Sequence, residues 1–276
     1  MSKIIKTKTS QNLKFDIQKI IKPLIGEITD LIKPNDKVLL KPNFNTADPF
    51  PASTDMNFLQ AMIEIIQSAK PKEIIIGESC TYFLNTEKVC REKGTPELME
   101  KFNITWHNFD QNDWVKVKVP GGKYFKSVSI PKITQEVDKI ILLPCLKTHR
   151  FAKFTMSLKI TIGMLKPILR GPLHLSNLEP RIAEVASVIQ PDLIIMDGRK
   201  CFVTQGPEEG QIETPNILMA TQNDRIALDV EALKILQSYK ADNILGNDPW
   251  ALDQIKRAVE LNLGAKSEAD YKIIEV

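Results

Sequence analysis

The chain has 276 residues, of which 43% are hydrophobic and 26% are charged, as in an ordinary globular protein with a sizeable core. Its formal net charge of +3 is too small to indicate nucleic acid or a membrane surface as a partner by itself. No apolar run approaches the roughly 18 to 20 residues of a membrane-spanning helix, and the N-terminal segment lacks the apolar region of a secretion signal. We therefore expect no membrane partner and a cytoplasmic location.

Short apolar runs alternate with segments of helical periodicity along the chain. The apolar runs predict core strands over 37–43, 72–79, 139–146, 192–198 and 216–222. Helical spacing predicts helices over 53–70, 95–102, 180–190, 224–239 and 249–264, the fourth of them capped and amphipathic. Apolar strands that alternate with helices are typical of an α/β fold with a mostly parallel sheet covered by helices on both faces. We therefore predict a single α/β domain over 1–276.

Two segments stand outside this alternation. The residues "WVKVKV" (114–119) and "YFKSVSI" (124–130) flank the turn "PGGK" and predict a β-hairpin in a small inserted lobe over 103–131. The last six residues, "YKIIEV", have the pattern of an edge strand. Such a strand either closes the sheet or pairs with a second copy in a homodimer, and the sequence favours neither.

The four cysteines are Cys80, Cys90, Cys145 and Cys201, and no two of them form a C-x-x-C pair. Structural zinc sites and iron–sulfur clusters use closely spaced cysteines. We therefore expect reduced, buried thiols and no iron–sulfur cluster held by this chain's own cysteines.

Polar and charged side chains follow four predicted strands at the points where the strands end. In open α/β sheets, ligands bind outside the carboxyl ends of the strands. Four such endings at one edge predict a shared crevice. The side chains expected to line it are, in chain order, Lys41, Asn43 and Asn45, then Glu78 and Ser79, then Lys147, Thr148 and His149, and finally Asp197 and Arg199.

The segment "IILLPCLKTHRFAKFTMSLKITIGML" (140–165) concentrates one histidine and four cations after a buried strand. This positive charge predicts a small anionic ligand. We expect the substrate-binding residues to be Lys41, Asn43, Ser79, Lys147 and Thr155.

Two residues of this segment are candidate catalytic groups. His149 can transfer a proton near neutral pH or bind a metal. Lys159 lies in a largely apolar run, and burial there would lower its pKa, which suits a base, a nucleophile or a covalent attachment site. The structural alternatives are that His149 caps a turn through a hydrogen bond and that Lys159 extends from a half-buried helix to solvent.

A bound transition metal is a special case of the same hypothesis. His174, Glu78 and Asp197 offer ligands of the kind that such metals use. The acidic loop "GPEEG" (206–210) places Glu208 where it would serve as a ligand or a base, or it is a solvated turn. The cofactor itself stays unknown at this point.

Several well-defined motifs are absent from the chain. No G-x-G-x-x-G opens a helix after a strand, which disfavours a Rossmann dinucleotide site. The chain also lacks a P-loop, an H-E-x-x-H pair and a G-x-S-x-G elbow. Common nucleotide, zinc-protease and serine-hydrolase chemistries are therefore not indicated.

The stretches "VLLKPNFN", "STD", "IIIGES", "LPCLKTHRFAKFTMSLKITIG", "PDLIIMDGR" and "GPEEG" resemble, in this order, the uncharacterised family named domain of unknown function 362. The likeness covers nearly the whole chain, and K-T-H followed by S-L-K-x-T-I-G is its most specific part. Many relatives carry a ferredoxin-like cysteine module and are described as iron–sulfur proteins. This chain lacks those cysteines, and it has Ile160 where the family usually has asparagine.

The order His149, Lys159, His174 is similar to an arrangement in nickel-pincer lactate racemases. The resemblance implies that Lys159 carries the cofactor, that His174 binds the metal and that His149 moves the substrate proton. Those racemases use a second proton-transferring histidine, and His107 has no matching context.

Three hypotheses follow. The first is an enzyme acting on a small carboxylate or phosphate, with His149 as acid or base and lysines as charge clamps. The second is a non-catalytic carrier of an anion or cofactor in the same crevice. The third, a nucleic-acid binder, is disfavoured because few aromatic residues interleave the basic run.

Overall fold

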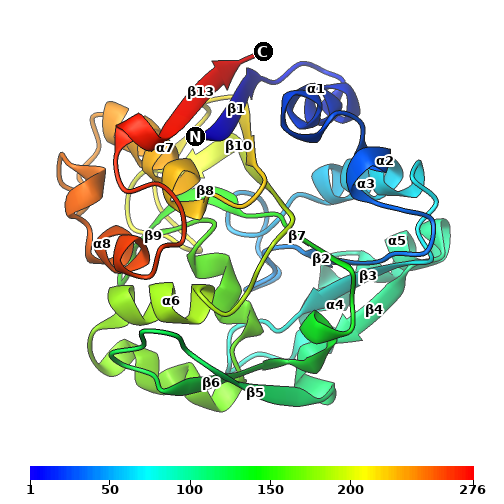
Figure 1. Cartoon of the computed structure of the whole chain (residues 1–276), viewed down its shortest axis with the longest axis horizontal. Helices are drawn as coiled ribbons and strands as arrows, with labels where there is room; N and C mark the ends of the chain where they lie inside the picture. Colours follow the sequence, from blue (N-terminus) through cyan, green and yellow to red (C-terminus); the bar gives the residue numbers. More distant parts are fainter.

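In the computed structural model, which describes residues 1–276, a large mostly parallel sheet is covered by helices on both faces (Figure 1). The strands are β1 (Ser2–Lys8), β2 (Lys37–Lys41), β3 (Glu73–Glu78), β4 (Thr105–Asn108), β5 (Trp114–Lys118), β6 (Ser127–Pro131), β7 (Lys139–Leu142), β8 (Cys145–His149), β9 (Lys153–Thr155), β10 (Leu193–Phe202), β11 (Ile212–Glu213), β12 (Ile217–Thr221) and β13 (Tyr271–Glu275). The α-helices are α1 (Leu13–Ile25), α2 (Ile28–Leu31), α3 (Met56–Gln67), α4 (Thr86–Glu92), α5 (Thr95–Phe102), α6 (Leu178–Ala186), α7 (Arg225–Ser238) and α8 (Asp253–Glu260). The prediction of an α/β fold is confirmed.

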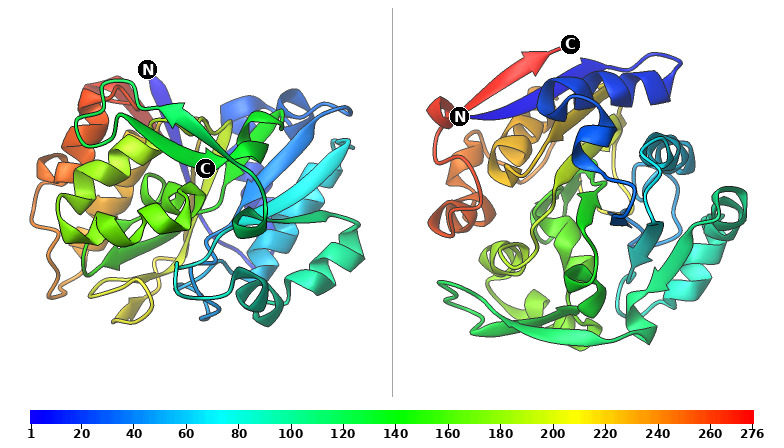
Figure 2. Two further views of the ribbon diagram at one scale, coloured as in Figure 1. Left: turned by 90° about the horizontal axis from the view of Figure 1, so that it is seen from below. Right: turned by 45° about the vertical axis from the view of Figure 1, so that its right-hand side comes forward.

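The strand order along the main sheet is β13-β1-β12-β10-β7-β2-β3-β4. The five strands from β10 to β4 are parallel, whereas β12 is antiparallel to both of its neighbours. The first and last strands of the chain are neighbours, because β1 pairs in parallel with β13, and Figure 2 shows these strands side by side. The final strand therefore forms one edge of the sheet, and its pairing with a second copy stays a prediction.

Alternate residues of each strand enter two separate hydrophobic cores, one on each face. Leu39 and Ile75 face the core built from α6, α7, α8 and the β5–β6 hairpin. Their neighbours Leu40 and Ile76 face the core built from α1, α3, α4 and α5. Because both faces are covered, the strands are apolar at consecutive positions rather than at alternate ones, which is why they appear in the sequence as short apolar runs.

The predicted strand over 139–146 is two strands in the structure. β7 ends at Leu142, and β8 begins at Cys145 after the break at Pro144, which has no N–H to donate to a neighbouring strand. β8 then pairs with β10 and turns back antiparallel into β9. This break places Lys147 and His149 on β8, beyond the end of β7.

Two predicted helices also differ from those observed. The segment 249–264 contains a 3-10 turn (Pro249–Ala251) and then α8, because Leu252 between them has an extended backbone. α7 is capped by Asp224 as expected, but it is not amphipathic, since it is buried on most sides between β8 and β12 and the later helices. Its buried polar residues, Arg225 and Asp229, hydrogen-bond backbone groups of neighbouring segments.

The predicted hairpin is the separate two-stranded sheet β5–β6, beside α6 (Figure 1). The buried carboxylate of Glu184 on α6 accepts hydrogen bonds from three consecutive backbone N–H groups of the connecting loop, residues 123–125. It also pairs with Arg257 on α8 at 2.5 Å. Residues 105–108 at the start of the 103–131 range form β4, which belongs to the main sheet.

Candidate functional site

The strand order reverses between β2 and β7. The chain passes from β2 to β3 on one side of this point and from β7 to β10 on the other. Connecting segments diverge at such a reversal and leave a crevice at the carboxyl edge of the sheet. A cavity of about 260 Å³ lies there, walled by the ends of β2 and β3, by β8 and β9, by residues 159–174 and by the loop at 207–208.

Nine of the ten side chains predicted for catalysis, substrate binding or metal binding line this cavity. They are Lys41, Asn43, Glu78, Ser79, Lys147, His149, Thr155, Lys159 and His174. The tenth, Asp197, is buried elsewhere and forms an ion pair with Arg199 at 2.7 Å. Arg199 also binds Asp55, the residue that caps α3, so this group holds β10 against α3 rather than facing the cavity. The roles predicted for the nine lining residues remain proposals.

The floor of the cavity is a buried ion pair between neighbouring strands. Lys41 ends β2, Glu78 ends β3, and their charged atoms are 2.5 Å apart with both side chains almost fully buried. Glu78 also accepts hydrogen bonds from the backbone N–H groups of Phe44 and Ser79. Burial lowers the pKa of Lys41, and the carboxylate of Glu78 opposes that effect, so the pair is locally neutral.

Gly163 packs directly on this ion pair. It belongs to η3 (Lys159–Met164), the 3-10 helix that carries Lys159. A Cβ at position 163 would lie 2.8 Å from Glu78 Oε1 and 2.9 Å from Lys41 Nζ, closer than real Cβ contacts. Only glycine therefore lets η3 approach the strand ends this closely.

Lys147 forms a second, unpaired positive group in the wall. Its Nζ donates to the carbonyl oxygens of Ala52 and Pro207, the latter at 3.1 Å. No carboxylate forms an ion pair with it, and burial lowers its pKa. Thr155, its partner across the β8–β9 pair, has no hydrogen-bond partner for its hydroxyl group and also lines the cavity.

The hydrogen bonds of His149 define which nitrogen faces the cavity. Its Nδ1 accepts from the backbone N–H groups of Phe151 and Ala152, at 3.1 and 3.2 Å. The proton of the neutral ring is therefore on Nε2. Burial lowers the pKa of His149 well below its usual value, and Lys159 and Lys147 lower it further. This environment makes His149 a neutral hydrogen-bond donor.

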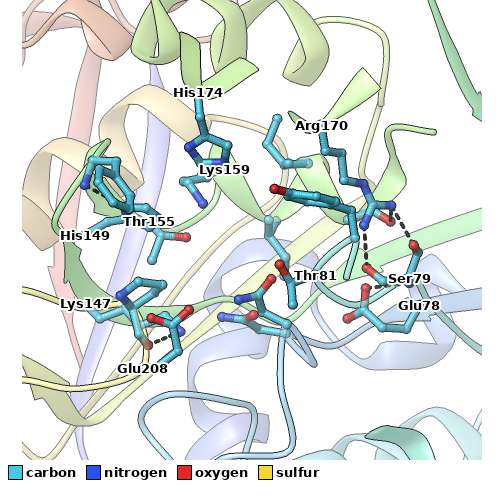
Figure 3. A pocket seen from close by; sticks show the side chains of 18 of the residues that line it. Glu78, Ser79, Thr81, Lys147, His149, Thr155, Lys159, Arg170, His174 and Glu208 are labelled. Atoms are coloured by element: carbon cyan, nitrogen blue, oxygen red, sulfur yellow. Dashed lines mark hydrogen bonds between the residues drawn. The ribbon is translucent and has the colours of Figure 1, made fainter. Parts of the chain in front are cut away.

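Lys159 is the one lining lysine with neither an ion pair nor a hydrogen bond. Burial, with a contribution from Lys147, lowers its pKa to about 7. The backbone just before Lys159 is fixed by α7, since the buried carboxylate of Asp229 accepts hydrogen bonds from the N–H groups of Ser157 and Leu158 at 2.9 and 3.0 Å. The segment that begins η3 is thus tied to α7, and the Lys159 amine extends into the cavity near His149 and His174 (Figure 3).

The opposite wall contains a residue that the sequence did not single out. Arg170 is buried and donates to the carbonyl oxygens of Cys80, Leu165 and Gly163, at 2.6 to 3.2 Å. It also donates to the Ser79 hydroxyl at 2.7 Å (Figure 3). It ties residues 163–170 to the end of β3. Ser79 also donates to Asp110, so its hydroxyl is fully engaged in holding the wall. A loop arginine in "LKPILRGP" carries no pattern that would have revealed this role.

The cavity carries more positive than negative charge. Five cationic side chains line it, against the two carboxylates of Glu78 and Glu208. Glu78 pairs with Lys41, and Glu208 approaches Arg150 at 3.2 Å. The remaining cations are Lys147, Lys159 and Arg170, so a bound anion would supply the missing charge.

A metal centre built only from protein ligands is not assembled. Glu78 and His174 both line the cavity, but no three His, Cys, Asp or Glu side chains come together in a geometry that could hold a metal ion. His174 makes no hydrogen bond, and its ring contacts Phe151 edge-on at 5.9 Å between centroids. Its imidazole is therefore free to act as a single ligand or donor.

We predict that Gly163→Ala displaces the Lys41–Glu78 pair. Crowding of the two buried charged groups should lower the free energy of unfolding by about 1 to 3 kcal/mol, measured by urea denaturation. Gly171→Ala is the matched control, since a Cβ there meets no atom within 4 Å. Equal stability of the two variants would contradict this account of the cavity floor.

The sequence of this chain matches one family model and one known protein. The family model described as "Domain of unknown function (DUF362)" matches residues 38–234. A thylakoid-associated protein of Synechocystis sp. is 27% identical over 263 residues, which cover 88% of this chain and 78% of that protein. Separately, none of the helices is both long and apolar enough to cross a membrane.

Two solved structures are similar at a lower level. The lactate racemase apoprotein from Thermoanaerobacterium thermosaccharolyticum has a TM-score of 0.46 and 12% identity, covering 99% of this chain and 82% of that chain. A protein from Thermotoga maritima has a TM-score of 0.44 and 13% identity, covering 74% of this chain and 53% of that one. This chain thus spans about half of the Thermotoga chain, and similarity at this level does not establish a shared mechanism. The match of the family model over residues 38–234 does establish that the chain belongs to the DUF362 family.

Proposed function

We propose that this protein is an enzyme that binds a small carboxylate or phosphate in the cavity and uses the amine of Lys159 as its reactive group. The observation that carries the proposal is the state of Lys159. It faces the cavity without a partner, and burial lowers its pKa to about 7. A lysine at the protein surface would be almost fully protonated at neutral pH.

The neighbouring groups favour an anion beside this amine. Lys147 has two backbone acceptors, which leaves one of its three N–H groups to bind an anionic oxygen. The Nε2–H of His149 and the Thr155 hydroxyl offer two further donors on the same wall (Figure 3). A carboxylate or phosphate would therefore bind between Lys147 and Lys159 with several hydrogen bonds.

Lys159 supports two kinds of chemistry on such an anion. As a neutral amine, it takes a proton from the substrate and becomes an ammonium that stabilises the negative charge left behind. Alternatively, its lone pair adds to a substrate carbonyl carbon, with loss of water, to give an imine. In both cases a pKa near the ambient pH favours the reaction.

We assign His149 as a neutral hydrogen-bond donor rather than as the general acid or base that the sequence indicated. Protonation of Nδ1 would place a proton against two backbone N–H groups. A neutral imidazole instead donates from Nε2 and polarises a substrate oxygen. Acid–base work then falls to Lys159.

A cofactor attached to the protein is a special case of this proposal. Lys159 and His174 are both free of protein partners, so these two residues would fit as an attachment point and a single metal ligand. Such a group would supply an electrophilic centre. Within the chain itself, Lys159 would still position the group, and Lys147 and His149 would still bind the anion.

The other hypotheses receive less support. A non-catalytic carrier would use the same anion-binding groups, but it would not need a lysine with a lowered pKa. A nucleic-acid surface would need exposed cations, whereas Lys147 and Arg170 are buried and Lys153 approaches Glu179 at 3.5 Å. The cytoplasmic location stays a prediction.

Glyoxylate, a carboxylate that bears an aldehyde, should test the amine directly. At pH 7 it should form an imine with Lys159 that cyanoborohydride reduces to a stable adduct, located by peptide mass spectrometry. Exposed lysines should react more slowly because they are protonated. Lys159→Arg should abolish this adduct, and Lys200→Arg at an exposed position should leave it intact. If the adduct formed on exposed lysines while Lys159 stayed unmodified, the proposal would be refuted.

The affinity for oxalate should depend on pH through the same residue. Below pH 7 Lys159 is already protonated, and its positive charge attracts oxalate. Above pH 7 Lys159 is mostly neutral in the free protein, so oxalate binding requires the amine to take up a proton. Affinity should therefore fall, approaching tenfold per pH unit, as the pH rises above about 7. Calorimetric titration of Lys159→Met should show a nearly flat profile. A flat profile in the unaltered protein between pH 6 and 9 would contradict the assignment.

A further inference from the structure

Exposed apolar side chains gather around the mouth of the cavity. Twelve large hydrophobic residues of the chain are exposed, and six of them lie on the three segments that form this mouth. We call these six residues the rim: Tyr82, Phe83, Leu84, Phe151, Ile168 and Leu175. Half of the exposed apolar side chains thus line this cavity or lie within two residues of a residue that lines it.

The rim is continuous with the anion-binding wall. Tyr82, Phe83 and Phe151 line the cavity itself. Ile168 and Leu175 belong to the same loops as the lining residues Arg170 and His174. An apolar surface therefore begins where the cationic surface ends.

The fold gives no reason for these side chains to be apolar. None of the six belongs to either hydrophobic core. Phe83 is 72% exposed and Phe151 is 62% exposed. Three consecutive exposed apolar residues, 82–84, are unfavourable in water unless they have a function, and contiguous patches of this kind mark binding sites.

The size of the cavity leaves part of a larger ligand outside it. Its volume of about 260 Å³ accommodates an anionic head group and a short body, about ten non-hydrogen atoms in all, since a cavity of about 150 Å³ binds benzene. On the far side of Phe151 and His174 lies a second hollow, lined mainly by polar and charged side chains that include Lys123, Glu179 and Lys256. An apolar group would avoid that hollow and lie instead against Tyr82, Phe83 and Phe151.

Building on the proposed function, we infer that the ligand is an amphiphilic anion: its carboxylate or phosphate head enters the cavity, and its apolar body covers the rim. This assigns the ligand to a chemical class that combines a compact negative head with an aliphatic or aromatic body. Small inorganic or two-carbon anions would then be only weak ligands of the same site.

A series of straight-chain carboxylates tests this inference. Affinities of acetate, butyrate, hexanoate and octanoate would be measured by calorimetry at one pH, below their micelle concentrations. Burial of each added methylene against the rim should tighten binding by about two- to fourfold. The double variant Phe83→Ser, Phe151→Ser should lose this dependence while it keeps the affinity for acetate.

Phe15→Ser on α1 is the matched control, because Phe15 is also exposed, at 57%, and lies far from the cavity lining. It should keep the chain-length dependence. Equal affinity for all four carboxylates would overturn the inference and leave the proposed function standing. Absence of binding by every anion, phosphate included, would overturn both.

Vesicles of phosphatidylglycerol distinguish a free ligand from a membrane surface. Sedimentation with vesicles that depends on Phe83 and Phe151, combined with a flat carboxylate series, would show that the rim binds a bilayer and would overturn the assignment to a free amphiphile. A steep carboxylate series with no sedimentation is the expected result.

Discussion

The arrangement of the cavity depends on the buried ion pair between Lys41 and Glu78. These residues end two adjacent parallel strands, and their charges are 2.5 Å apart in a region almost closed to solvent. A buried pair adds little net stability by itself, but either charge alone would be costly. The pair therefore fixes the two strand ends in one geometry and presents a compact, neutral surface. Gly163 packs on that surface, and through it the 3-10 helix that carries Lys159 is held over the sheet edge.

The same construction explains why Lys159 differs from the other lysines of the site. Lys41 has a carboxylate partner and Lys147 has backbone acceptors, whereas Lys159 has neither. The helix is anchored from one side by Asp229 and from the other by Gly163, so its start is fixed over the sheet edge and the partly exposed Lys159 side chain lies in the cavity. Its neutral form is then favoured, and an anion in the cavity would favour the charged form instead. Binding and protonation are coupled at this one atom.

Much of the fold could be predicted from the sequence, because buried parallel strands give short apolar runs that alternate with helical periodicity. The strand ends also indicated the cavity, since Lys41, Glu78, Lys147 and His149 follow such runs directly. What the sequence could not provide was tertiary information. The interruption at Pro144 carries β8 to a new partner strand, Asp197 pairs with Arg199 away from the cavity, and Arg170 acts through backbone carbonyls that no spacing pattern reveals. The protonation of His149 likewise depends on tertiary structure, because the turn at 150–152 directs two backbone N–H groups at its Nδ1 atom.

The central claim is that Lys159 is an amine of lowered pKa that responds to an anion. It is tested most directly by nuclear magnetic resonance of protein with ¹³C-labelled lysine, following the Cε signal of Lys159 through a pH titration, with Lys159→Arg to assign it. The account predicts a midpoint near pH 7 that moves upward when oxalate is added. A midpoint near the ordinary lysine value of about 10.4, unchanged by the anion, would contradict it.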